Sequence, residues 1–323
     1  MVQGVVGIFQ RPVLFITAFA AFLVLWGCAG MRVTGPPLAT IPGTPGHFGI
    51  GQILELGPDT KIPFDEFIER LSSRDLIFIG EIHDNAEHHL IQLQILQALV
   101  DRCGPITVAM EFFQKPNQEA MDRYVRGELK ESAFLEAVDW TRTWGYHYHL
   151  YRPLLLAAKE RSLKILAINA PAPLVRKVAR EGLRGLSAEE RSQVAAEIDL
   201  GNQAHREYLF EAYREHTHQE LRRFQDFYEA QCVWEETMAE TLSNHLKEKG
   251  GKVLVFAGNG HIARKFGIPD RTVRRWPVPM ATVIPYPLSA KTEIRRDTAD
   301  YVWLTADSPR RFIRFHEQKR MAR

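Results

Sequence analysis

The sequence predicts an α/β protein with a mostly parallel sheet flanked by helices, and with a helical insertion or subdomain in its second half. Two apolar runs rich in β-branched residues, 76–79 and 253–257, are continuous rather than alternating. Such runs are typical of strands buried on both faces of a parallel sheet. Strand-like runs also alternate with helix-like segments along the chain, which is the element order of α/β folds.

The spacing of apolar residues predicts the elements in chain order. Helices are expected at 64–71 and 85–102, the second with an apolar stripe of leucines. Residues 173–248 are dominated by Glu, Arg, Gln, Ala and Leu, which predicts a helical subdomain. Strands are expected at 75–79, 106–110, 163–168, 253–257, 281–284 and 301–304.

Composition and charge exclude some classes of function. The 323 residues are 45% hydrophobic, which is enough to bury a sizeable core. Forty-one basic and 39 acidic side chains give a formal net charge of +2, so no global field favours nucleic acid as a partner. The chain has no dinucleotide fingerprint, P-loop or serine-hydrolase elbow.

The N-terminus predicts a secreted, lipid-anchored protein. Arg11 precedes an apolar stretch at 13–25, which has the length of a secretory signal's apolar region and is short for a membrane span. The stretch leads into Gly27-Cys28, which resembles a bacterial lipoprotein signal cleaved before a cysteine that is then lipidated. We therefore predict that residues 1–27 are the signal and that Cys28 is the lipidation site; an ordinary signal peptide with an incidental cysteine is the alternative.

The rest of the chain divides into a tether and one domain. Residues 28–60 are rich in Gly, Pro and Thr, which predicts a flexible tether. Residues 61–323 are predicted to form the α/β domain. Only Cys103 and Cys232 remain in it, so at most one internal disulfide is expected, and two unpaired thiols are favoured.

Two glycine turns carry the strongest functional signal, because each brings a histidine to the end of a predicted strand. They are Gly80-Glu81-Ile82-His83 and Gly258-Asn259-Gly260-His261. Ligands of parallel sheets bind beyond the carboxyl ends of the strands, so we expect the two turns to lie close together. With Glu111 after the strand at 106–110, they supply two carboxylates and two imidazoles: Glu81, Glu111, His83 and His261. This set suits a divalent metal or acid–base chemistry, and helix capping or core packing is the structural alternative for each residue.

The helix that follows the first turn adds two more histidines. Asp84 and Glu87 have the spacing of a capping box and are assigned to structure. His88 and His89 fall in the first turns of this helix, and at most one is expected to point toward the strand ends. Both are counted among the residues that could contact a cofactor.

A third cluster, residues 144–153, is dense in aromatic, imidazole and phenol groups. Such a surface can stack against a flat ring system and offer an axial ligand to iron, for which Tyr146, Tyr148 and Tyr151 are candidates. Arg152 could pair with a propionate. An aromatic hinge is the structural alternative. In the helical stretch, His205 is expected on a solvated face, and one of Glu235 and Glu236 is expected to turn inward.

Together these motifs resemble the ChaN family of haem-binding, iron-regulated lipoproteins, in a superfamily with Tiki metalloproteases and erythromycin esterases. The resemblance runs from about residue 60 to beyond 270, and implies an α/β core with a helical part and a role in haem or iron uptake. It also implies a tyrosine as the haem ligand, without choosing among the three. The motifs are Gly80-Glu81-Ile82-His83-Asp84, His88-His89, Ala109-Met110-Glu111, Trp144-Gly145-Tyr146, Tyr151-Arg152-Pro153, Ala167-Ile168-Asn169, Glu235-Glu236-Thr237-Met238-Ala239 and Ala257-Gly258-Asn259-Gly260-His261.

Two hypotheses follow. The first is a haem-binding protein, lipid-anchored to the outer membrane on its periplasmic side, with the aromatic cluster against the ring and strand-end groups at the propionates. Its partners are haem and the membrane, with an outer-membrane haem receptor and a second copy as candidates. The second is a metal-dependent hydrolase similar to Tiki, in which Glu81, His83, Glu111 and His261 hold Mn, Co or Zn or activate water. Whether the protein is an enzyme stays open.

Overall fold

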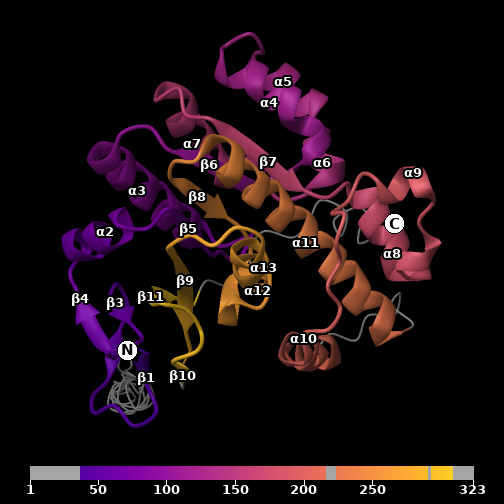
Figure 1. Cartoon of the computed structure of the whole chain (residues 1–323). Helices are drawn as coiled ribbons and strands as arrows, with labels where there is room; N and C mark the ends of the chain where they lie inside the picture. Colours follow the sequence, from indigo (N-terminus) through magenta and orange to yellow (C-terminus); the bar gives the residue numbers. More distant parts are fainter. Residues whose placement is uncertain (1–36, 216–222, 290–291, 308–323) are drawn as a thin grey trace, which may run out of the picture. The chain divides into compact units, whose positions relative to one another are not determined.

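An eight-stranded sheet lies at the centre of the computed structural model, with the strand order β4-β3-β11-β9-β5-β8-β6-β7 (Figure 1). The structure describes residues 37–215, 223–289 and 292–307. Neighbouring strands from β11 (Tyr301–Ala306) to β7 (Ile165–Asn169) are parallel. Only β3 (Ile53–Glu55) and β4 (Thr60–Ile62) pair antiparallel in this sheet of the described residues. The predicted fold class, an α/β protein with a mostly parallel sheet, is confirmed.

The two continuous apolar runs form neighbouring strands in the middle of the sheet. They are β5 (Leu76–Ile79) and β8 (Val253–Phe256), which pair in parallel and whose residues are all fully buried. Side chains alternate between the two faces, so both faces need apolar cover. Burying one such side chain contributes about 1.5–3 kcal/mol, which is why charges are missing from these runs. The flanking strands are β9 (Met280–Leu288) and β6 (Thr107–Gln114).

Helices cover both faces of the sheet (Figure 1). On one face, α2 (Phe64–Ser72), α3 (Ala86–Cys103) and α7 (Tyr148–Glu160) pack on residues such as Ile77 and Ile79. On the other face, the long helix α11 (Phe224–Lys249) packs on Leu76 and Phe78 together with α13 (Ile268–Arg275). The core is therefore divided into two layers by the sheet.

The predicted helical stretch contains α8 (Ala172–Glu181), α9 (Ala188–Arg191), α10 (Gln203–Glu215) and α11, and no strand among its described residues. This stretch is part of the main domain, because Met238 and Leu242 of α11 pack in the core against the sheet. The remaining helices are α4 (Gln118–Val125), α5 (Glu131–Ala137) and α6 (Trp140–Thr143) after β6, α12 (Asn259–Ile262) after β8, and the short 3-10 turns η1 (Lys115–Asn117), η2 (Leu183–Gly185) and η3 (Ala263–Lys265).

The predicted tether needs correction. From residue 37 onward the chain folds back onto the domain, and β3 pairs with β11 in the register Leu54↔Val302. A second, three-stranded sheet joins β1 (Leu38–Thr40) to β2 (Phe48–Gly49) and β10 (Thr292–Glu293). The glycines and prolines lie between very short strands, two of which, β1 and β3, pair with strands far along the chain. The signal, Cys28 and the start of the tether lie outside the described residues.

Two smaller predictions concern helix capping and cysteines. Asn85, not Asp84, caps α3, because its side chain accepts hydrogen bonds from the backbone amides of Glu87 and His88. Cys103 and Cys232 are both free, the first exposed and the second buried.

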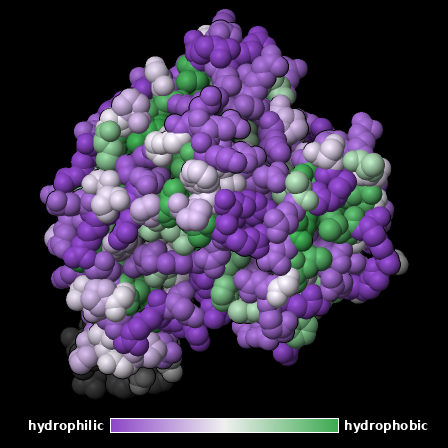
Figure 2. Space-filling model, viewed as in Figure 1, coloured by the Kyte–Doolittle hydropathy of each residue, from purple (hydrophilic) through white to green (hydrophobic). Residues whose placement is uncertain are grey.

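The surface is predominantly polar on the face that Figure 2 shows, where apolar residues form small separate patches. In the described ranges, none of the helices combines the length and apolar character needed to cross a membrane.

Candidate functional site

The two glycine turns meet at the carboxyl ends of β5 and β8, each making room for the other. The amide of Asn259 donates to the carbonyl oxygen of Glu81 at 2.8 Å. A Cβ on Gly258 would lie 2.9 Å from Cε1 of His83, and a Cβ on Gly80 would overlap the side chain of Asn259. Both glycines therefore allow close approach, since a side chain at Gly80 would overlap Asn259 and one at Gly258 would displace the ring of His83.

Glu111 lies between the turns, at an irregularity of β6 rather than after the end of the strand. The pairing of β6 with β7 shifts register between Met110 and Gln114, which turns Glu111 toward the neighbouring turn. Its Oε2 accepts a hydrogen bond from the amide of Gly258 at 2.6 Å, and its Oε1 lies 3.5 Å from Nε2 of His261. Burial opposes ionisation, but His261 and this amide hold the pKa of Glu111 below its ordinary value.

Glu81 and His83 form the outer carboxylate–imidazole pair. Nδ1 of His83 lies 2.7 Å from Oε1 of Glu81, and the histidine side chain is 24% exposed while the carboxylate is fully buried. Nε2 of Gln92 donates to Oε2 of Glu81 at 2.9 Å, and the Tyr151 hydroxyl lies 3.3 Å from Oε1. Desolvation opposes it, but the Glu81 hydrogen bond raises the pKa of His83 above its ordinary value.

His261 is the inner histidine, locked between two carboxylates. Its Nδ1 lies 3.1 Å from Oε1 of Glu235, on the side opposite Glu111, and the residue is only 6% exposed. Burial disfavours the imidazolium, but the two carboxylates outweigh it and raise the pKa of His261 to about 10. His261 is therefore a buried cation at neutral pH.

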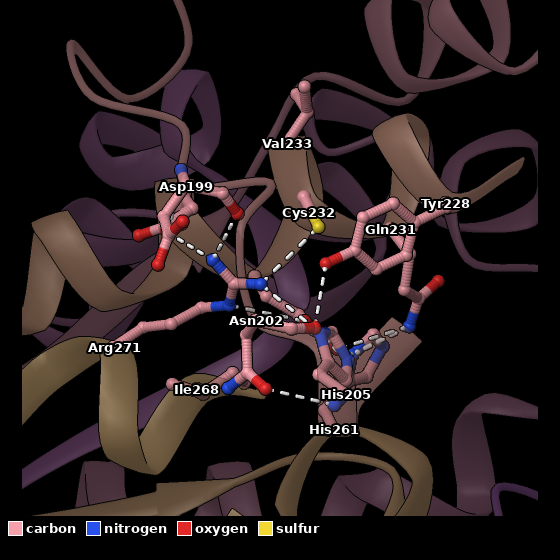
Figure 3. Close-up of polar contacts among 12 residues, drawn as sticks. Asp199, Asn202, His205, Tyr228, Gln231, Cys232, Val233, His261, Ile268 and Arg271 are labelled. Carbon is pink, nitrogen blue, oxygen red and sulfur yellow. Dashed lines mark hydrogen bonds and ion pairs between the residues drawn. The ribbon is translucent and has the colours of Figure 1, made fainter. Parts of the chain in front are cut away.

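A buried charge network backs this histidine, between α10, α11 and α13 (Figure 3). The Arg271 guanidinium is ion-paired with Glu235 and Glu236, and its Nη2 lies 3.2 Å from Nδ1 of His205 and 3.3 Å from the Cys232 thiol. This corrects two expectations. His205 is buried instead of solvated, and both Glu235 and Glu236 turn inward, because Arg271 supplies the compensating charge.

A cavity of about 690 Å³ opens beside the outer pair. Two tryptophans line it: Trp144, after α6, and Trp234, on α11. The His83 ring packs edge-on against Trp144 at 4.8 Å, and the His261 ring packs in the same way against Trp234 at 5.0 Å. His83 itself lines the cavity, whereas His261 lies behind its tryptophan.

The cavity also has a basic rim. Arg142 lies in α6 and is ion-paired with Asp139. Arg176 lies on the exposed side of α8. Both line the cavity, and Arg176 has no ion-pair partner within the described part of the chain. A flat, apolar ligand that carries acidic groups fits this combination of walls and rim.

Two amide side chains hold the wall of the cavity in place. Nδ2 of Asn169 donates to the Glu111 carbonyl oxygen at 2.7 Å, and its Oδ1 accepts a hydrogen bond from the Trp234 indole. Oε1 of Gln114 accepts from the amide of Ala172 at 3.2 Å, at the start of α8. Asn169 ends β7 and Gln114 ends β6, so the strand-end rule applied to Glu81 and His83 would have found both.

The tyrosines and Arg152 are placed differently from what the sequence suggested. Tyr151 is fully buried, and its hydroxyl donates to the His83 carbonyl oxygen at 3.0 Å. The Tyr148 hydroxyl lies 3.4 Å from Glu131, which also takes the ion pair of Arg152. None of these side chains lines the cavity in the described residues, which corrects the expectation that the 144–153 segment presents them to a ligand together.

The ring of Tyr146 packs against the ring of the outer histidine. Its half-buried ring lies 4.9 Å from that of His83 and 5.6 Å from that of Trp144, at the edge of the site.

His88 and His89 both reach the first turn, contrary to the expectation that at most one would. Nδ1 of His88 accepts the amide of Ile82 at 2.9 Å, and Nε2 of His89 lies 3.1 Å from the His83 carbonyl oxygen. Both are buried, and burial lowers the pKa of His88 to about 4. Both histidines hold the turn through these hydrogen bonds to its backbone. Neither lines the cavity formed by the described residues.

The acidic and imidazole groups are arranged as pairs more than as one ligand shell. Across residues 37–215, 223–289 and 292–307, no group of three His, Cys, Asp or Glu side chains is placed to hold a metal ion.

This fold and site define an α/β protein with paired strand-end histidines beside a tryptophan-lined cavity. The model of the family described as "Haem-binding uptake, Tiki superfamily, ChaN" matches residues 67–272, and the chain belongs to this family. The resemblance inferred from the motifs is thus confirmed.

Three known proteins are similar to this chain to different degrees. The structure of ChaN of Campylobacter jejuni, reported for cofacial haem binding, is similar with a TM-score of 0.62 and 22% identity, covering 78% of this chain and 95% of that one. The erythromycin esterase EreC is more distant, with a TM-score of 0.45 and 16% identity over 73% of this chain and 76% of its own. The chloroplastic protein RETICULATA-RELATED 5 of Arabidopsis thaliana is 22% identical over 80% of this chain, which spans 37% of that relative's length.

Proposed function

We propose that the protein binds haem in the cavity between Trp144 and Trp234. The observation that carries this proposal is the pairing of two indole walls with a basic rim, since haem is a flat macrocycle with two propionates. The cavity volume of about 690 Å³ lies within the usual range for small-molecule sites. Arg142 and Arg176 would take the propionates, in place of the expected Arg152, which does not line the cavity of the described residues. Family membership supports the same ligand.

Haemin titration tests this proposal. Wild-type protein should give a saturable change in the Soret band. The double variant Arg142→Ala/Arg176→Ala should bind about 10-fold more weakly, because exposed charge-assisted bonds contribute on the order of 1–2 kcal/mol in total. Arg180→Ala, on the exposed side of the same helix but off the cavity, is the matched control and should bind normally.

Haem dimethyl ester separates charge from packing. It lacks the propionate charges, so wild type and the double variant should bind it equally. If the double variant binds haemin as tightly as wild type, the proposal that Arg142 and Arg176 contact the propionates is wrong.

We further propose a role in haem or iron uptake, with the protein lipid-anchored through Cys28 to the outer membrane on its periplasmic side. Support comes from the signal-like stretch before Cys28 and from the uptake role in the family description. An outer-membrane haem receptor and a second copy of the chain are candidate partners for handing haem on. The variant Cys28→Ser should lose fatty-acid labelling and move into the soluble periplasmic fraction; unchanged partitioning would contradict the anchor.

A second candidate function, hydrolysis, is favoured by one observation. The pairs Glu81–His83 and Glu111–His261 lie next to the cavity, and ligand binding alone has no need of two carboxylate–imidazole pairs. In this proposal His83 takes a proton from water, with or without a divalent Mn, Co or Zn ion. Metal analysis of the purified protein and ester hydrolysis lost in Glu111→Gln would support it. If the purified protein contains no metal and hydrolyses no ester, the hydrolase proposal is wrong and haem binding remains as the proposed function.

A further inference from the structure

We propose that the exposed side of α8 and η2 is a docking surface for a partner protein that presents acidic side chains around an apolar contact. This surface, the arginine face, consists of Arg176, Arg180 and Arg184 with the apolar residues beside them. It adjoins the mouth of the cavity. That the partner exchanges haem with the cavity rests on the proposed function, whereas the docking itself does not.

The first argument is unpaired positive charge. Residues 172–185 carry four basic side chains and one acidic side chain, a net charge of +3, whereas the whole chain carries +2. Lys177 is ion-paired with Glu190, but the three arginines are exposed and form no ion pair or side-chain hydrogen bond within the described ranges. Other exposed arginines, such as Arg142 and Arg152, do have acidic partners. The arginine face therefore has charge available for an acidic partner.

The second argument is how α8 is held in the domain. Arg176 and Arg180 are four residues apart, so they lie on one side of the helix. The opposite side carries the buried Leu174 and Val178, which pack in one cluster with residues of α11. Arg184 follows in η2 and is exposed as well. The helix is thus fixed by its inner side and presents charge outward on a rigid element.

The third argument favours a protein over a lipid surface. Val175, Ala179 and Leu183 are only half-buried beside the arginines, and Figure 2 shows apolar residues gathered over α8 and α9 with hydrophilic residues around them. Protein interfaces combine an apolar centre with arginine, a charged residue that is enriched in them. The anchor proposed at Cys28 joins the domain at β1, which lies across the domain from α8 (Figure 1). The arginine face is therefore remote from that point of attachment.

The fourth argument is continuity with the cavity. Ala172, Val175 and Arg176, all in the first turns of α8, line the cavity. Arg180 and Arg184 lie further along and do not line the cavity formed by the described residues. A partner docked on the arginine face therefore reaches the cavity mouth with one edge, while the more distant arginines contact the partner alone.

Fluorescence anisotropy tests the docking surface on the full-length protein. The probe is a labelled synthetic peptide with glutamates on both sides of a leucine pair, and the same peptide with lysines in place of glutamates is the charge control. Wild type should bind the acidic peptide and not the basic one. Raising the salt concentration from about 50 mM to about 500 mM should weaken this binding, because the Debye length shortens severalfold.

Paired substitutions locate the binding. Arg180→Ala/Arg184→Ala should bind the acidic peptide about 5-fold more weakly, because two exposed charge pairs contribute on that scale. Lys247→Ala/Lys249→Ala removes two exposed charges from the end of α11 and is the matched control, which should bind like wild type. Both double variants should keep wild-type haemin titrations. The charge reversal Arg180→Glu/Arg184→Glu should bind the basic peptide instead.

Each outcome decides between the alternatives. Equal binding of the acidic and basic peptides by wild type, or undiminished acidic binding in Arg180→Ala/Arg184→Ala, overturns the proposal. Binding to phosphatidylglycerol vesicles without binding to the acidic peptide would make the surface a lipid contact and also overturn it. Wild-type protein without any Soret change on haemin addition would remove the proposed function and leave the peptide result standing. Circular dichroism of each variant confirms that the fold is retained.

Discussion

His83 and His261 follow neighbouring parallel strands in similar glycine turns, yet their surroundings differ. His83 has one carboxylate partner, is 24% exposed and lines the cavity. His261 has two carboxylate partners, is 6% exposed and lies behind Trp234. Each packs edge-on against one tryptophan of the cavity. The difference teaches that a shared motif places a residue, but the number of charged partners and the depth of burial decide whether it can meet a ligand.

The largest expected effect comes from breaking the inner site. Glu235→Ala should lower the free energy of unfolding by about 3–5 kcal/mol, because it leaves the buried His261 and Arg271 with too little negative charge. Urea denaturation measures the change. Glu131→Ala, which breaks a partly exposed ion pair with Arg152, should cost less than about 1 kcal/mol. If both variants lose the same free energy of unfolding, the inner charge network is no more important for stability than an exposed ion pair.

The pH dependence of stability should also separate the two histidines. The pKa of His261 is raised from 6.5 to about 10 in the folded protein. Its stabilising contribution is therefore complete below pH 6.5 and is lost as the pH rises through about 10, since the unfolded state releases its proton first. Denaturation at a series of pH values should show this decline.

Matched variants assign the decline to the right residue. His261→Gln should flatten the slope between pH 6.5 and 10. His83→Ala should flatten it less, because His83 has one carboxylate partner and His261 has two. A slope that His261→Gln leaves unchanged would show that other groups cause it.

Alanine substitutions at two glycines, one beside each histidine, test how tightly the two histidines are packed. A Cβ on Gly267 would overlap the carbonyl oxygen of His261, which belongs to the backbone, so Gly267→Ala should cost about 1–3 kcal/mol. A Cβ on Gly258 would come closest to the ring of His83, at 2.9 Å, which is a side chain that can shift more easily than backbone. Gly258→Ala should therefore lose less stability but weaken haemin binding; the reverse ranking in denaturation and titration would contradict this reasoning.

The smallest effect is expected at the support of the outer pair. Tyr151→Phe removes a buried hydroxyl that bonds to the His83 carbonyl oxygen and lies near Glu81. We expect a loss of about 0.5–1.5 kcal/mol in thermal or urea denaturation, the usual net contribution of one hydrogen bond. A loss above about 3 kcal/mol would mean that this tyrosine fixes the whole turn.

How far prediction succeeded depended on whether the signal was local. The strands at 76–79 and 253–256 were predictable because a strand buried on both faces needs a continuous apolar run. The strands between 38 and 62 were missed, because they are two or three residues long and two of them, β1 and β3, pair with β10 and β11, more than 200 positions away. The local sequence pattern does not indicate pairing between such distant strands.

The same distinction applies to the site. Glu81, Glu111, His83 and His261 were found because polar residues at the ends of buried strands must gather at one sheet edge. The roles of Arg142, Arg176 and Trp234 were missed, because they come from three helices whose approach depends on packing. His205 was misjudged since its partner Arg271 lies 66 positions later.

By itself, the sequence determined the class of fold, the family and the pair of histidine-bearing turns, because these depend on the order and local pattern of residues. Only the tertiary structure decided that His83 lines the cavity, that His261 is enclosed by two carboxylates and that Tyr151 is buried as a support. The physical reason is that burial and charge compensation are properties of neighbours in space, and here those neighbours come from distant parts of the chain.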